Sequence, residues 1–366
     1  MRKKNEEVEQ IEDLAEEAKE EEKNEEENQE EGMALKNLTS EDLSIARDKL
    51  RKYKDYKGEL ERRIRNNEEW WKLRHWGISQ SKEDKDAKHM AEPVSAWLHN
   101  SINNKHADMM DNYPEPMVLP REESDDPTAK TLTAILPVIL EYNDYEQVYS
   151  DSAWYKLKQG CSAKIVGWNS RKNNGLGDVD IRRIDLLNLF WEPGISDIQD
   201  SENVFHVQLV SNDILRKNYP DAAAVIGNKE IDLTQYVCQD AVDDGEKTAV
   251  IDWYYKRDNG TREVLHYCKF VGDVILYASE NDPDYAERGF YDHGKYPFVL
   301  DSLFIQEGSP AGFGYIDIMR DPQMYIDKMN RVILDASVKS AKARYFIADN
   351  AGVNEEEFNK LRSEER

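Results

Sequence analysis

The stretch DPQMYIDKMNRVILDASVKSAKARY, residues 321–345, decides the fold because it predicts one long, unbroken helix late in the chain. Asp321 is a capping acid, and Pro322 suits the first helical position. No glycine or further proline interrupts the 24 residues from 322 to 345, which would span roughly 36 Å at 1.5 Å per residue. The helix is amphipathic, since one face carries an apolar stripe formed by Met329, Val332, Ile333 and Ala336, with Tyr325 and Ile326 in line.

Three bases, Lys339, Lys342 and Arg344, cluster in the final turns of this predicted helix. The helix dipole can account for them, because it favours cations near a helix C-terminus. A basic surface that faces a polyanion such as DNA is the more specific alternative, and the dipole role is the simpler explanation. The sequence leaves both roles open.

The residues just upstream, 160–312, predict mostly antiparallel β structure. Asn259-Gly260 and Gly272-Asp273 are hairpin turn pairs, and they separate three strand candidates. These candidates are residues 249–256, 262–270 and 274–278. A further hairpin joins residues 164–168 to residues 178–184 through the glycine-rich turn 173–177. The turn chemistry makes these hairpins the firmest local prediction in the chain.

The sequence of residues 39–159 predicts several helices. The first begins at Thr39, an N-cap residue, and carries a seam of Leu43, Ala46, Leu50, Tyr53, Leu60 and Ile64 with Lys57 as its one polar step. We expect that seam to pack against a neighbouring helix or subunit. Trp70, Trp71 and Trp76 predict a packed knot at the helix end. Further helices are expected from Pro93 to Asp111, and from Asp126-Pro127 through Leu140 with a bend at Pro137. Helical propensity continues past Tyr145 to about Gln159.

Charge sets a boundary on function. The net charge is −25, of which residues 1–32 contribute −10 from fifteen acids and five bases, so we expect residues 1–37 to form a disordered acidic tail. A protein that holds DNA statically needs a basic surface to displace counterions, and the chain as a whole lacks one. The 19 tyrosines fit either subunit contacts or a tyrosine-rich β core.

The cysteines and the apolar runs indicate the cellular compartment in which the protein is made. Three cysteines without a CxxC pair indicate reduced thiols rather than disulfides or zinc. The start lacks a signal peptide, and the longest apolar run, residues 131–140, is too short to cross a membrane. We therefore expect a soluble protein that is intracellular when synthesised.

No catalytic or nucleotide-binding signature occurs in the sequence: it has no Walker A loop, HExxH, GxSxG or strand-linked GxGxxG motif. His99 and His106, seven residues apart on a helix, are too far apart to share a metal. Asp178 and Asp180 share a strand face, and Cys268 follows His266, yet neither arrangement has the partners that catalysis needs. The sequence therefore predicts a protein that is not an enzyme and has no cofactor and no bound metal.

Three stretches together resemble tailed-bacteriophage portal proteins. They are SAWYKLKQG (152–160) running into AKIVGWN (163–169), GLGDVDI (175–181) followed by RIDLLNLFWEP (183–193), and HGKYPF (293–298) followed by GFGYI (312–316) and DPQMYIDKMN (321–330). The second stretch departs from the family pattern, because Leu186-Leu187 replaces the usual proline step. The order and spacing of the three over residues 90–350 carry the resemblance.

The resemblance implies an α+β fold: helices and an antiparallel β wing at residues 38–312, then a stem helix at 313–345. Residues 346–366 would begin a clip region, and the chain looks truncated because the second stem helix and crown do not follow. Its function would be that of a structural subunit in a homo-oligomeric ring, usually a dodecamer, at the virion's portal vertex. By the same resemblance, the subunit would be made in the bacterial host cytoplasm. The ring would pass double-stranded DNA non-specifically during packaging and ejection. Its other implied partners are the large terminase, the major capsid or scaffold protein and a head-tail adaptor, with no membrane involved.

Two groups of residues are candidate sites if the chain is such a subunit. The stripe of Tyr325, Met329, Val332, Ile333 and Ala336 would face neighbouring subunits, and Lys339, Lys342 and Arg344 would face DNA in the lumen. The alternatives are another phage head-assembly or scaffold protein, a metal-dependent hydrolase using His99 and His106, and a nucleic-acid-binding module. A ring seen by electron microscopy, metal analysis and a salt-dependent DNA-binding assay would distinguish them.

Overall fold

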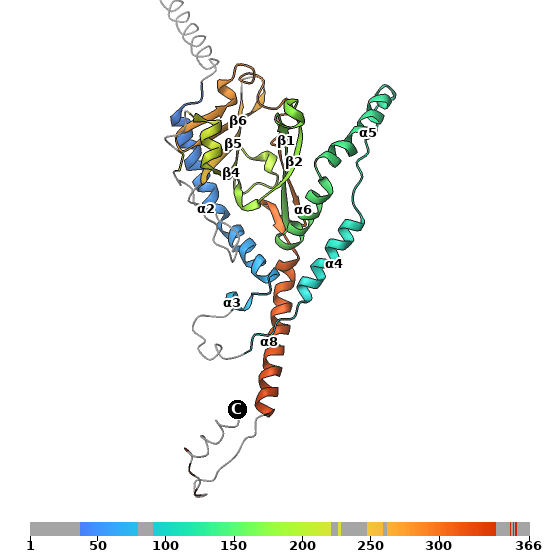
Figure 1. The fold of residues 1–366 in the computed structure, drawn as a ribbon, viewed down its shortest axis with the longest axis vertical. Helices are drawn as coiled ribbons and strands as arrows, with labels where there is room; N and C mark the ends of the chain where they lie inside the picture. Colours follow the sequence, from blue (N-terminus) through green and yellow to red (C-terminus); the bar gives the residue numbers. More distant parts are fainter. Residues whose placement is uncertain are drawn as a thin grey trace, which may run out of the picture.

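The computed structural model describes residues 37–79, 91–220, 226–227, 247–258, 262–341 and the positions 352, 354 and 356. It confirms the α+β class, with helices, antiparallel sheets and a long late helix (Figure 1). The predicted acidic tail, 1–37, lies outside the described residues apart from residue 37, and so does the Asn259-Gly260 turn. Among the described residues, no helix is both long and apolar enough to span a bilayer.

The first helix, α2 (Ser40–Trp71), packs on a five-stranded antiparallel sheet with the order β3-β4-β5-β6-β7. Thr39 caps the helix, since its backbone N–H donates to the Asp42 carboxylate at 2.9 Å. The strands are β3 (Leu189–Trp191), β4 (Asn203–Ser211), β5 (Lys247–Asp258), β6 (Glu263–Val271) and β7 (Val274–Ala278). The predicted meander is confirmed as β5, β6 and β7.

The seam of α2 is a correction to the sequence prediction. Leu43, Ala46, Leu50 and Tyr53 are buried, but they lie in one core with Phe205 and other residues of this sheet rather than against another helix or subunit. Buried Tyr254, Tyr255 and Tyr296 likewise place several tyrosines in a β core. The periodicity identified the buried face of α2 correctly. The predicted partner, another helix or subunit, was wrong, because the sheet covers this face.

A second sheet, in the order β2-β1-β8, is joined by the short hairpin β9-β10. Its elements are β1 (Cys161–Asn169), β2 (Asp178–Ile184), β8 (Phe298–Ser302), β9 (Phe304–Gln306) and β10 (Ser309–Phe313). The predicted hairpin is confirmed, with Val166 opposite Ile181. Several short elements lie elsewhere along the chain. They are the helices α3 (Trp76–Ser79) and α7 (Asn212–Asn218), and the 3-10 turns η2 (Glu123–Asp125), η3 (Asn173–Gly175), η4 (Leu186–Asn188), η5 (Ile198–Asp200) and η7 (Ser279–Asn281).

Helices α4 (Trp97–Asp111), α5 (Asp126–Tyr142) and α6 (Tyr145–Gln159) form the other flank (Figure 1). Two boundaries differ from the prediction. Pro93 lies before α4 rather than at its first position, and the stretch from 126 to 159 breaks at Asp144, whose φ of 46° is left-handed. A left-handed residue ends the helical hydrogen-bond ladder, so the helical propensity of residues 126–159 is divided between two helices.

The long helix, α8 (Tyr315–Ala341), begins earlier than predicted, and Pro322 lies inside it. Asp317 rather than Asp321 closes its first turn, because its carboxylate accepts the Gly314 backbone N–H at 2.9 Å. Pro322 is exposed, so its ring does not face packed neighbours. The helix is nonetheless continuous through residue 341, and residues 342–345 lie outside the described part.

Lys57, the polar step in the α2 seam, is buried, and its Nζ donates to the backbone oxygens of Leu186 and Leu189 at 2.6 Å each. Burial lowers the pKa of its ammonium from 10.5 to about 7, although Glu61 and Asp185 act in the opposite direction. Between these pH values the unfolded chain binds a proton that the folded chain does not. The contribution of Lys57 to the free energy of unfolding therefore increases as the pH rises from 7 toward 10.5.

This shift predicts a pH-dependent effect of Lys57→Met. The free energy of unfolding of the wild type, relative to that of the variant, should rise by about 2 kcal/mol between pH 7 and pH 9. Urea unfolding at both pH values measures it, with Lys52→Met, an exposed lysine on the same helix, as the control. If the free energy of unfolding changes with pH in the same way in the wild type and in Lys57→Met, burial does not lower the pKa of Lys57.

Candidate assembly surface on the long helix

The first half of α8 is anchored in an apolar cluster where it meets α2, α4 and α6. Ile316 is buried there with Trp70, Leu98, Ile102 and Leu157, so that α2, α4 and α6 all contribute to the anchor. The predicted tryptophan knot is present, since Trp70 stacks on His75 with ring centroids 4.1 Å apart. The root of α8 is therefore held by three helices at once.

A buried polar network reinforces this anchor further along α8. Asp327 is fully buried, and its carboxylate accepts the Ser95 backbone N–H at 2.8 Å and the Gln323 side-chain amide at 3.0 Å. His75, also buried, places its Nε2 at 3.0 Å from the same carboxylate. Burial lowers the pKa of His75, while Asp327 opposes that shift. Asn330 donates to the Ser95 hydroxyl at 2.9 Å, which extends the network along α8.

The sequence analysis missed this network. Its members come from three separate segments, and the one local signal is the four-residue spacing of Gln323 and Asp327, which places both on one helix face. Polar residues at that spacing are common on solvated helix faces. Only the tertiary fold shows that this face is turned inward.

The opposite face of α8 carries the predicted apolar stripe, and it is exposed. Tyr325, Met329, Val332 and Ile333 have between 60% and 68% of their surface accessible, and Ala336 is exposed as well. Helical spacing places the stripe on the face of α8 away from the buried Asp327, and much of α8 extends beyond the two sheets (Figure 1). Contiguous exposed apolar surface of this kind marks an interaction site. The structure brings the five candidate interface residues together on one face of the helix.

The candidate lumen residues are only partly described. Lys339 is exposed and forms an ion pair with Asp335, one turn earlier, at 2.7 Å. Lys342 and Arg344 lie outside the described residues. The role of all three bases toward DNA remains a prediction.

The residues considered for chemistry lie in structural contacts. His99 stacks on Trp71 with centroids 4.1 Å apart, and His106 stacks on Trp154 at 3.9 Å. Asp180 pairs with Lys172 at 2.9 Å. Cys268 is buried in the sheet, and burial raises the pKa of its thiol. Within the described ranges, no group of three or more histidine, cysteine or acidic side chains could hold a metal.

Comparison with known proteins identifies one family for the chain. The family described as "Phage P22-like portal protein" matches residues 97–365, which includes α4 to α8 and both sheets. No curated protein matches the chain.

Proposed function

Because the chain belongs to the phage P22-like portal protein family, we propose that its copies form the ring through which DNA passes at the capsid's unique vertex. The family is one of structural, non-enzymatic proteins, and its members work as oligomeric rings. The finer role that we propose is a channel for packaging and ejection that docks the large terminase, the capsid or scaffold protein and a head-tail adaptor. The subunit assembles in the host cytoplasm and resides at the portal vertex of the virion.

One observation carries this proposal: an amphipathic rod is anchored at one end and bare along its outer face. The anchored face buries Gln323 and Asp327, whereas the outer face exposes Tyr325, Met329 and Val332. A monomer gains nothing from an apolar stripe held in solvent. Copies arranged around an axis can bury it between adjacent stem helices.

The charge of the chain supports the proposed channel. A chain with a net charge of −25 is poorly suited to displace the counterions that surround DNA phosphates, so DNA can slide rather than stick. Lys339 near the end of α8 would provide a local, weak contact, to which Lys342 and Arg344, outside the described residues, would add. The Lys339 ion pair with Asp335 moderates that contact further.

Met329→Asp should prevent ring formation because it places a carboxylate in the centre of the stripe. Loss of a central interface residue weakens association by roughly 2 kcal/mol or more, a factor of about 30. Native mass spectrometry of the purified chain measures the oligomer directly. Ser337→Asp, which adds the same charge at an exposed position beside the stripe, is the control and should leave rings intact. If Met329→Asp forms rings of unchanged mass and stability, the apolar stripe of α8 is not part of the subunit interface.

A further inference from the structure

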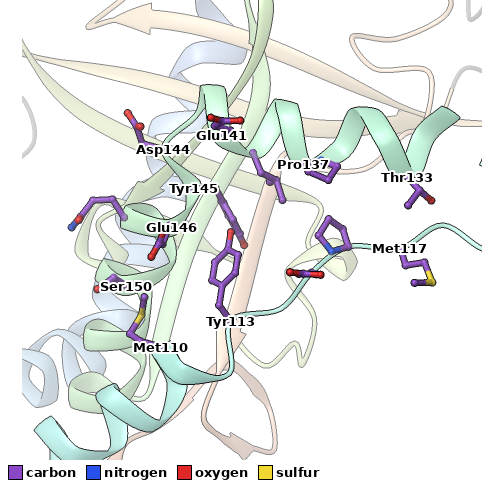
Figure 2. Close-up of a pocket in the computed structure, with 14 residues that line it drawn as sticks. Met110, Tyr113, Met117, Thr133, Pro137, Glu141, Asp144, Tyr145, Glu146 and Ser150 are labelled. Carbon is purple, nitrogen blue, oxygen red and sulfur yellow. The ribbon is translucent and has the colours of Figure 1, made fainter. Parts of the chain in front are cut away.

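A groove opens where the segment after α4, the second half of α5 and the start of α6 meet (Figure 2). Its volume is about 830 Å³, which is within the usual range of ligand-binding sites. The Val118 backbone N–H donates to the Thr133 hydroxyl at 3.0 Å, and this bond holds the segment after α4 against α5. Helical spacing turns the apolar side of α5, which exposes Leu132, Ile135 and Val138, away from the groove. The groove is therefore a separate feature of this helix.

The corner between α5 and α6, at one end of the groove, is fixed to the second sheet. The Asn143 side-chain oxygen accepts the Ile181 backbone N–H at 3.1 Å and the Lys172 Nζ at 2.6 Å. The Asn143 side-chain amide donates to the Ile139 carbonyl at 2.8 Å. These bonds hold the end of α5 in one position. A preformed site of this kind loses less entropy when a ligand binds.

The lining of the groove is acidic. The described residues that line it include no base and four acids, Glu115, Glu141, Asp144 and Glu146. All four are exposed, and none belongs to an ion pair with another described residue. Helices α4 and α5 both end here without a base in the last turn, so their dipoles add negative potential. Glu146 lies in the first turn of α6 and offsets the positive end of that helix.

Aromatic and apolar side chains share the groove with these acids. Figure 2 shows Tyr113 and Tyr145 pointing toward one another, and their ring centroids are 6.4 Å apart. The faces of tyrosine rings attract cations. The apolar part of the lining is made of Met110, Pro116, Met117, Pro137 and Leu140. Such a surface suits the aliphatic stem of a lysine or arginine, whose charged head can remain among the acids.

This lining narrows the class of ligand. Within the described ranges, no group of three or more acidic, histidine or cysteine side chains could hold a metal, so the four acids do not converge on one point. Acids spread along a groove fit a ligand whose positive charges are also spread. Nucleic acids and anionic lipids carry charge of the wrong sign. A basic stretch of polypeptide has the right sign, spaced charges and apolar side chains.

We propose that this groove binds a basic peptide segment of a partner protein, with a lysine or arginine side chain between Tyr113 and Tyr145. Further bases of the segment lie beside Glu141 and Glu146, and its apolar side chains contact the apolar part of the lining. The partner is a different protein. A second copy of this chain would bring its own net charge of −25 to an acidic surface, which opposes docking.

The groove and the stem are at opposite ends of α4. Near its start, the Leu98 backbone N–H donates to the Gln323 side chain of α8 at 3.3 Å. Met110, which lines the groove, is twelve residues further along α4, or roughly 18 Å at 1.5 Å per residue. A peptide in the groove therefore leaves the exposed stripe of α8 free. The inference adds a docking site to the proposed ring and does not depend on how the ring closes.

Isothermal titration calorimetry of the full chain tests the groove with a short peptide of alternating lysine and leucine, acetylated and amidated at its ends. The wild type should bind it and should not bind the peptide in which glutamate replaces lysine. Glu141→Gln/Glu146→Gln keeps the shape of the groove and removes two charges, so it should weaken binding roughly tenfold. Tyr145→Leu keeps an apolar side chain and removes the ring, so it should weaken binding roughly threefold to fivefold.

The matched control is Glu41→Gln/Glu307→Gln, which removes the same charge from two exposed positions outside the groove. It should bind the lysine–leucine peptide within about twofold of the wild type, because exposed charges at a distance are largely screened. Equal weakening in the control and in Glu141→Gln/Glu146→Gln would show that the peptide responds only to net charge, and would overturn the site. No binding by the wild type, or unchanged binding by both groove variants, would overturn it too.

Titration of assembled rings tests the identity of the partner. Rings should bind the lysine–leucine peptide as tightly as the monomer does, since a different protein needs the groove open after assembly. Binding that is lost on assembly would assign the groove to a neighbouring copy and overturn the proposed partner. The groove variants should form rings of wild-type mass in native mass spectrometry. Failure of the groove proposal would therefore leave the proposed function standing.

Discussion

Asp327→Ala is expected to destabilise the protein by about 3–5 kcal/mol, because it removes a buried carboxylate that several buried polar groups share, at about 1–3 kcal/mol for each group left unsatisfied. The carboxylate is fully buried and serves three donors at once: His75, the Ser95 backbone and the Gln323 side chain. Alanine would leave the Ser95 N–H without this acceptor and the His75 ring without its carboxylate neighbour, and the Gln323 amide would keep only its bond to the Ser95 backbone oxygen. Each unsatisfied buried polar group adds its own desolvation penalty.

The control for this variant lies on the same helix. Asp335→Ala removes an exposed ion pair with Lys339 one turn away, and such pairs contribute less than about 1 kcal/mol. Urea unfolding gives both free energies, and hydrogen exchange of the α8 amides shows whether the helix has separated from the wing. Similar small losses in both variants would mean that the apolar cluster holds α8 without help from Asp327.

Local chemistry determines which parts of the fold were predictable from the sequence. The β1-β2 hairpin and the β5-β6-β7 meander are signalled by glycine and asparagine turns, which restrict the backbone over a few residues. The N-terminus of α2 at Thr39 is equally local, since its capping bond reaches only three residues along the chain. Interactions of this range act before any tertiary contact forms, so the sequence alone reveals them.

The errors occurred where a long-range contact overrides a local preference. Asp321-Pro322 has the chemistry of a helix start, but Gly314 and Asp317 begin α8 earlier, where Asn67 of α2 donates to the Asp317 carboxylate at 3.0 Å. The α2 seam was placed correctly and matched to the wrong partner. A helical repeat identifies a buried face but carries no information about what covers it.

The candidate site divides in the same way. The apolar stripe on α8 followed from periodicity and is exposed along one face of the helix, although its role as a subunit interface stays a prediction. The network around Asp327 did not follow, because His75 and Ser95 are more than 200 positions away in the sequence. The exposure of the apolar face of α5 could not be inferred either. Its residues have the pattern of an ordinary apolar helix, and only the fold leaves them bare.

The second large effect is expected at Gly160, where α6, the second sheet and the start of α8 meet. Its φ of +91° lies in the left-handed region, which a side chain disfavours by about 1–2 kcal/mol. A Cβ at this position would lie 2.3 Å from the backbone carbonyl carbon of Phe313, two residues before α8 begins. The Gly160 carbonyl also accepts the Leu303 backbone N–H at 2.8 Å, so this backbone cannot move without disturbing the sheet.

Gly160→Ala should therefore lower the free energy of unfolding by about 2–5 kcal/mol, combining the left-handed strain with the 1–3 kcal/mol typical of overpacking. Gly194→Ala is a matched control, because its φ of +86° is nearly the same while nothing lies within 4 Å of the added Cβ. It should lose only the roughly 1–2 kcal/mol of backbone strain. Chemical unfolding measures the loss of unfolding free energy in each variant. The difference between the two losses is the cost of the contact between the added methyl group and Phe313. Because that contact sets where α8 leaves the wing, Gly160→Ala should also weaken ring assembly, whereas Gly194→Ala should not. Equal losses of stability in the two variants would show that the junction yields to a methyl group and does not set the direction of the stem.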